Sequence, residues 1–189
     1  GSSTATSGAT TGFATTGPLA LRTVLEELIL CGNSHITDSV HAFRMHTDKS
    51  DAVLHGIPDY NTGPFYPKDV IEYGERAVYI GGAGYWAQFI GWTAVGSTYD
   101  WQSAGSGWHV LRHGPHRAVD QLQGASLVGP NLALFRQRSI IRGYRTGNPA
   151  GAIRISEWIE GVGTDSQFSI AMAEEGTLFL GHDRMVYFL

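Results

Sequence analysis

Several features common in small extracellular or metal-binding domains are missing from this 189-residue sequence. Cysteine occurs once, as Cys31, so an intramolecular disulfide and a cysteine-rich zinc module are both excluded. No asparagine lies in an Asn-x-Ser/Thr sequon, so N-glycosylation gives no support for a secreted scaffold. A lone cysteine of this kind is most often a buried, unreactive thiol, which is the role we expect for Cys31.

Long apolar runs and lysine are scarce as well. No stretch of about 18 apolar residues occurs, so a membrane-spanning helix is not expected. The first residues lack the basic and apolar regions of a signal peptide. Residues 1–17 consist almost wholly of Gly, Ser, Thr and Ala, and we interpret them as a flexible linker that includes residues left by a cloning vector. Because methionine does not begin the chain, we expect a fragment of a longer protein, with one β-rich globular domain at 18–189.

Short alternating segments between glycine-rich turns are the main signal that is present. They predict a mainly β fold, an antiparallel β-barrel or β-sandwich with a few short helices. A repeat of fixed period is not visible, which argues against propellers and solenoids. Turns are predicted at 174–176 and 181–183. The expected strands are 77–80, 85–95, 108–112, 132–141, 152–159, 167–173, 177–180 and 184–189.

Helical segments are expected to be few. Residues 22–30 carry apolar side chains at helical spacing after a capping-box-like Thr23 and Glu26, but they fit a buried strand equally well. Proline at position 67 and glycine at position 74 predict a helical turn over 67–73. A further short helix is expected over 116–123.

Aromatic residues are concentrated between positions 86 and 108, where four of the five tryptophans lie among Gly, Ser, Thr and Gln. Aromatic rings on small polar loops combine flat apolar surface with hydrogen-bonding groups, which suits sugar rings and protein epitopes. Core packing is the expectation for Trp86 and Trp92. For Tyr99 and Trp101, inside the loop, recognition and packing are equally open, and we take both as candidate ligand-binding residues.

Charge is distributed unevenly along the chain. Residues 101–156 hold seven arginines and one acid, a net charge of +6, while the remainder has a net charge of −10. If residues 134–142 form one strand, Arg136, Arg138 and Arg142 project from the same face and could bind a carboxylate, sulfate or phosphate. Pairing with acids of this chain or of a second subunit is an equally good explanation. Nucleic acid is not expected as a partner, since the overall charge is −4.

Catalytic and metal-binding signatures are weak. His109, His113 and His116 fall within eight residues, but their spacing matches no known ligand pattern, so we expect no metal and no cofactor. The sequence lacks Gly-x-Ser-x-Gly and the Walker A motif. The glycines at 81–84 are better explained by a hairpin turn than by a phosphate-binding loop, because a strand is predicted to follow them.

These patterns favour a non-enzymatic recognition domain. Its Gly/Thr/Ser-rich, lysine-poor composition and aromatic loops resemble those of a receptor-binding spike or fibre tip of a viral capsid or phage. The expected partners are a host-cell glycan or protein receptor and further copies of the chain, for which residues 185–189 would suit an interface. The expected location is the virion or particle surface, without membrane insertion. The alternatives are a hydrolase or lyase whose His and carboxylate groups meet in space, and a structural oligomerisation module.

Overall fold

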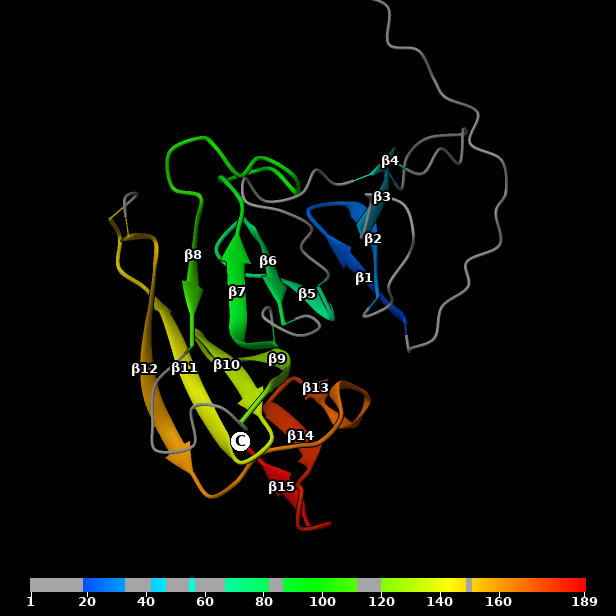
Figure 1. Cartoon of the computed structure of the whole chain (residues 1–189), viewed down its shortest axis with the longest axis vertical. Helices are drawn as coiled ribbons and strands as arrows, with labels where there is room; N and C mark the ends of the chain where they lie inside the picture. Colours follow the sequence, from blue (N-terminus) through cyan, green and yellow to red (C-terminus); the bar gives the residue numbers. More distant parts are fainter. Residues whose placement is uncertain are drawn as a thin grey trace, which may run out of the picture.

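Four antiparallel sheets follow one another along the chain in a computed structural model (Figure 1). The structure describes residues 19–32, 67–81, 87–111, 120–148 and 151–189, and the backbone of residues 42–46 and 55–56. Each sheet is a meander, because every described strand pairs only with its neighbours in sequence. We call the sheets A, B, C and D in chain order.

Sheets A, B and C have four strands each, and sheet D has three among the described residues. Sheet A contains β1 (Leu19–Val24), β2 (Glu27–Gly32), β3 (Ala42–His46) and β4 (His55–Gly56). Sheet B contains β5 (Asp69–Glu72), β6 (Ala77–Ile80), β7 (Phe89–Trp92) and β8 (Gly107–Val110). Sheet C contains β9 (Leu122–Val128), β10 (Asn131–Arg136), β11 (Ser139–Arg145) and β12 (Ile153–Glu160). Sheet D contains β13 (Ala171–Ala173), β14 (Gly176–Leu180) and β15 (Val186–Phe188).

The expectation of a mainly antiparallel β fold is confirmed, and the sheets pack face to face as in a sandwich, without a closed barrel. The turns predicted at 174–176 and 181–183 join β13 to β14 and β14 to β15. The sequence pattern of residues 22–30 fitted a helix and a buried strand equally well. The structure shows that these residues belong to the β1–β2 hairpin. Leu25 and Glu26 form its turn with φ of 49° and 63°, a conformation that favours glycine or asparagine.

Of the short helix expected over 116–123, residues 116–119 lie outside the described residues, and residues 122–123 begin β9. Three other local predictions were wrong. Residues 69–72 form strand β5, not a helical turn. The expected strand 132–141 is two strands, β10 and β11, with a tight turn at Gln137 and Arg138. The expected strand 167–173 begins as a 3-10 turn, η3 (Gln167–Ser169), and only its last three residues form β13.

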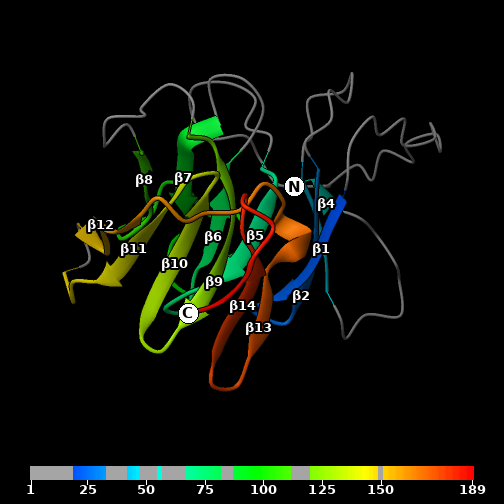
Figure 2. The same cartoon turned by 90° about the horizontal axis from the view of Figure 1, so that it is seen from below.

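The first strands of successive sheets lie next to each other: β1 beside β5, β5 beside β9, and β9 beside β13 and β14 (Figures 1 and 2). Successive four-stranded meanders arranged in this way resemble the blades of a β-propeller. The described strands of sheets A and D lack the extensive contact that would close a ring. The missing sequence repeat therefore did not exclude a repeated architecture, because the sheets share strand order without sharing sequence.

A separate hydrophobic core fills each space between neighbouring sheets. Ile29, Cys31, Tyr79 and Phe89 belong to the core between sheets A and B. The largest core lies between sheets B and C and includes Ile80, Ile90, Leu122, Leu132, Leu134 and Ile141. The core between sheets C and D contains Phe135, Ile140 and Phe179. Among the described residues, helices long and apolar enough to cross a membrane do not occur.

Candidate functional site

The loop between β7 and β8, residues 93–106, is held by hydrogen bonds along its whole length. Backbone groups fix its start, where Ala94 N donates to Asp100 O at 2.8 Å and Gly96 N donates to Glu75 O at 2.7 Å. The Asp100 carboxylate accepts the backbone N–H groups of Gln102 and Ser103, both at 2.9 Å. Hydrogen bonds from Ser103 and Gln102 lower the pKa of Asp100, so this carboxylate is charged at neutral pH and keeps the bend in place.

Side chains from two sheets anchor the same loop. The Tyr79 hydroxyl donates to Thr98 O at 2.7 Å, and the Thr98 hydroxyl bonds to the Glu27 carboxylate of sheet A. At the far end, Trp92 Nε1 donates to Gly105 O at 3.1 Å. These anchors connect the loop to β2, β6 and β7, so its backbone is ordered before any ligand arrives.

The two aromatic residues predicted to bind ligand have different surroundings. Trp101 is 8% exposed and its ring lies 5.1 Å from that of Tyr79, inside the core between sheets A and B. Tyr99 is 44% exposed. Sequence reasoning did not single out Trp108 on β8, which is 49% exposed and stacks on Phe89 at 6.0 Å. Its place on the outermost strand of sheet B explains the exposure, and no sequence signal separated it from the core tryptophan Trp92.

Arg136 is a buried structural residue, because it is 2% exposed at the end of β10. Its Nη2 donates to Leu111 O at 2.6 Å, and its Nη1 lies 3.9 Å from Asp120 Oδ2. Burial lowers the pKa of Arg136, and the Asp120 charge acts in the opposite direction. Of the two explanations given for the arginine cluster, pairing with an acid of this chain applies at this position.

The prediction that three arginines share one strand face was wrong, because the chain turns between them. Arg138 lies in the β10–β11 turn with an exposed side chain, and its backbone N–H donates to Asp120 Oδ1 at 2.7 Å. Arg142 lies in the middle of β11 and is partly buried, with its guanidinium 5.5 Å from the centre of the Tyr144 ring. Arg138 and Arg142 therefore remain separate surface cations and do not form a single anion clamp with Arg136.

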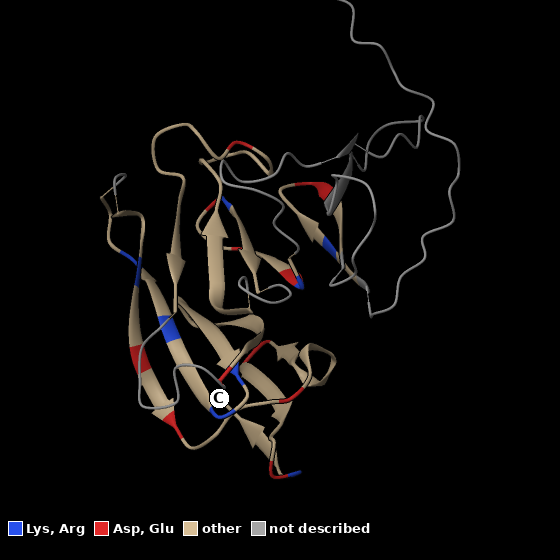
Figure 3. Ribbon diagram, viewed as in Figure 1, with Lys and Arg blue, Asp and Glu red and all other residues tan. Residues whose placement is uncertain are grey.

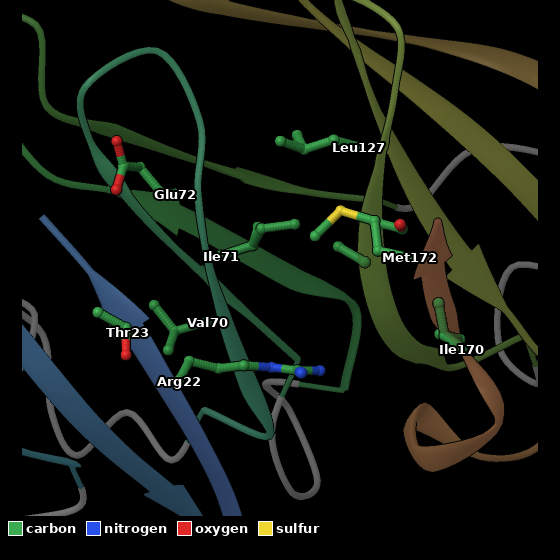
Figure 4. A pocket seen from close by; sticks show the side chains of 10 residues that line it. Arg22, Thr23, Val70, Ile71, Glu72, Leu127, Ile170 and Met172 are labelled. Carbon is green, nitrogen blue, oxygen red and sulfur yellow. The ribbon is translucent and has the colours of Figure 1, made fainter. Parts of the chain in front are cut away.

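A pocket of about 190 Å³ lies where the first strands of all four sheets meet (Figure 4). Each of the four sheets contributes to its lining. The lining residues are Arg22 and Thr23 from β1, Val70, Ile71 and Glu72 from β5, Ala125, Ser126 and Leu127 from β9, Met172 from β13, and Ile170 directly before β13. Sequence reasoning missed these residues because they come from four segments spread over 150 positions, and each segment by itself looks like an ordinary strand.

Three polar side chains around this pocket, those of Arg22, Glu72 and Ser126, already have partners. Arg22 forms a two-point contact with Asp69, Nε to Oδ1 at 3.0 Å and Nη2 to Oδ2 at 3.1 Å, which raises the pKa of Arg22. Glu72 Oε2 accepts the Leu25 N–H at 2.9 Å, and Ser126 Oγ lies 2.6 Å from Thr177 Oγ1. The remaining surface is mainly apolar, and the volume is below that of a typical drug-sized ligand site. The pocket can therefore accommodate a single side chain or a small apolar molecule.

Where the structure describes the chain, neither the thiol of Cys31 nor a metal cluster offers catalytic chemistry. Burial raises the pKa of the Cys31 thiol well above its usual range, so the reactive thiolate is disfavoured. Within the described ranges, no group of three His, Cys, Asp or Glu side chains could hold a metal ion. His109 lies on β8, whereas His113, His116 and Trp86 lie outside the described residues.

Comparison with known proteins adds nothing to this geometry: no protein-family model matches the sequence, and no curated protein matches it.

Proposed function

We propose that this chain is a non-enzymatic recognition domain whose loop 93–106 contacts a glycan or protein receptor. The observation that carries the proposal is the combination of a fully anchored loop backbone with the exposed ring of Tyr99. A loop ordered in advance loses little conformational freedom on binding, so more of its contact energy becomes affinity. Rigid aromatic residues on such loops are common anchors in recognition surfaces.

The partners of three buried carboxylates favour recognition over the hydrolase or lyase alternative. Acid–base catalysis needs carboxylates that can exchange protons with a substrate. Here Asp69 is paired with Arg22, Glu27 bonds to Thr98, and Asp120 receives hydrogen bonds from the β10–β11 turn. Each of these carboxylates holds two segments of the fold together, which leaves it poorly placed for chemistry.

A particle-surface location is part of the same proposal. The chain is rich in glycine, with 25 residues, contains two lysines, and presents its aromatic loop on a scaffold of stacked sheets. That combination suits a domain at the tip of a viral capsid spike or phage fibre, where loops on a rigid β scaffold meet the receptor.

The proposal is tested by screening the purified chain on a glycan array and on candidate host cells. Saturable binding without product formation supports it, and turnover of a bound compound refutes it. In the chain that binds, Tyr99→Ala should weaken affinity by about 30-fold if the ring is an anchor worth about 2 kcal/mol. Phe168→Ala is the matched control, since this ring is 61% exposed on η3, away from the loop, and should leave affinity unchanged.

Two further variants define the site. Trp108→Ala tests whether the exposed ring of Trp108 on β8 also belongs to the binding site. Arg138→Ala should flatten the salt dependence of binding to an anionic ligand, because exposed charges are screened over about 8 Å at physiological ionic strength. Trp101→Ala is not a suitable test of binding, because removing a buried ring disturbs the fold itself. Unchanged affinity in both Tyr99→Ala and Trp108→Ala would show that the loop is not the binding site.

A further inference from the structure

One face of sheet D is apolar and exposed. Leu178 and Leu180 on β14 are 42% and 45% exposed, and Val186 and Phe188 on β15 are 72% and 59% exposed. The strand register pairs Leu178 with Phe188 and Leu180 with Val186, so the four side chains form one continuous patch.

The opposite face of sheet D is a packed interface. Phe179 lies 4.9 Å from Phe135 of sheet C and 5.4 Å from Tyr187, measured between ring centres. On the same face, Thr177 bonds to Ser126 of β9. Sheet D thus carries apolar residues on both faces, the pattern of a sheet that lies between two layers.

Charge is missing from the exposed face as well. The strands β13, β14 and β15 contain no charged residue, and in Figure 3 the charges of this sheet lie in its turns. Exposed strands of soluble proteins usually carry charged residues that prevent association. The exposed face of sheet D therefore lacks the charges that would oppose association with another apolar surface.

We propose that two copies of this chain associate through the exposed faces of sheet D, packed face to face about a two-fold axis. The patch is apolar and uncharged, so it is complementary to itself, and two-fold contacts are the commonest closed assemblies. Sheet-on-sheet packing is also how the chain joins its own sheets. This contact does not depend on the ligand proposed for loop 93–106.

The area of the exposed apolar patch indicates how strongly two copies should associate. A large apolar side chain offers on the order of 200 Å² of accessible surface, so the four residues and the neighbouring alanines expose roughly 450 Å². Two copies would bury roughly 900 Å², slightly below the about 1,000 Å² expected of a stable specific interface, so the association should be weak and concentration-dependent.

Sedimentation equilibrium of the purified chain, from about 1 µM to about 500 µM, tests the proposal. The parent chain should form dimers over this range. Val186→Lys should raise the dissociation constant at least tenfold while leaving the circular dichroism spectrum and melting temperature of the monomer unchanged, and Leu180→Lys should act likewise. Leu21→Lys is the matched control, because Leu21 is a 59% exposed leucine on sheet A, and this variant should dimerise like the parent.

Three results would overturn the proposal. The first is a parent chain that stays monomeric at the highest concentration. The second is a dimer that persists in both Val186→Lys and Leu180→Lys. The third is dissociation by Leu21→Lys, or association beyond a dimer, either of which would indicate head-to-tail contacts between sheets A and D.

Discussion

Replacement of Asp120 by asparagine tests whether the arginine-rich segment is structural at its centre. The Asp120 carboxylate is 3% exposed, accepts the backbone N–H of Arg138 at 2.7 Å and the Ser139 hydroxyl at 2.6 Å, and lies 3.9 Å from the Arg136 guanidinium. The amide keeps the size of the side chain but removes the charge. It also places an N–H donor opposite either the backbone N–H or the guanidinium.

The expected loss follows from these contacts. Removing one partner of a buried ion pair costs about 3–5 kcal/mol, because the remaining charge stays buried without compensation. Since asparagine retains one acceptor, we expect Asp120→Asn to lower the free energy of unfolding by about 3 kcal/mol. For a chain of this length, that corresponds to a fall in melting temperature of roughly 6–12 °C.

Urea denaturation with parallel thermal melts measures the effect. Arg138→Ala is the control: only the backbone of Arg138 contacts Asp120, so its exposed side chain should contribute less than about 0.5 kcal/mol. Combining Asp120→Asn with Arg136→Met should cost less than the two single losses added together, since neither charge is then buried alone. A loss below about 1 kcal/mol in Asp120→Asn, or strict additivity in the double variant, would refute the role assigned to this ion pair.

Two further predictions concern a glycine and a tyrosine. Gly163→Ala should lower the free energy of unfolding by more than about 2 kcal/mol, because a Cβ atom there would overlap the backbone of Arg136; a melting temperature equal to the parent's would contradict this. In Tyr187→Phe, the pKa of Asp183 should rise toward its ordinary value, as the Tyr187 hydroxyl, 2.6 Å from Asp183 Oδ2, is the main cause of its lowering. Stability that depends on a lowered carboxyl pKa is lost as pH falls through that pKa, so the variant should lose less stability in acid. NMR titration of Asp183 checks this, and an unchanged pKa would exclude the tyrosine as the cause.

Strands bounded by glycine or by acidic turns were predictable from the sequence. Residues 77–80 match β6, and 152–159 match β12 within one residue at each end. All four residues of β6 are apolar and buried, and Ile153 and Ile155 of β12 pack into the core between sheets B and C, so the local pattern and the tertiary contacts agree.

Turns stabilised from a distance were not predictable. The β1–β2 turn at Leu25 and Glu26 contains no glycine or asparagine, and a carboxylate of β5, Glu72, accepts its Leu25 N–H. The turn that precedes β11 is likewise held by Asp120, through the Arg138 N–H. Both stabilising groups lie 18 or more positions away in sequence, so no local signal marked the turn.

The candidate site was only partly predictable, because contacts with residues distant in sequence decide which of its side chains are exposed. The composition of loop 93–106 pointed to Tyr99, which is exposed, but gave no means to separate it from Trp101, which packs against Tyr79 of a different strand. The strand pattern placed Arg136 and Arg138 on one face because the intervening turn was not recognised. Burial of a tryptophan or an arginine is decided by the partner sheet, and single-sequence patterns do not contain that information.

The strictly sequential strand pairing has a consequence for how such a chain could change in evolution. Because every described strand bonds only to its chain neighbours, each sheet forms one continuous block of sequence joined to the next by a single connection. Duplicating or deleting a whole block would leave all hydrogen-bonded ladders in the remaining blocks intact. It would alter only the contacts at the two faces of that block, which are the apolar cores and polar contacts such as that between Arg22 and Asp69. Selection could therefore add or remove one sheet at a time. An added sheet would be retained when its two faces pack against the faces of the neighbouring sheets.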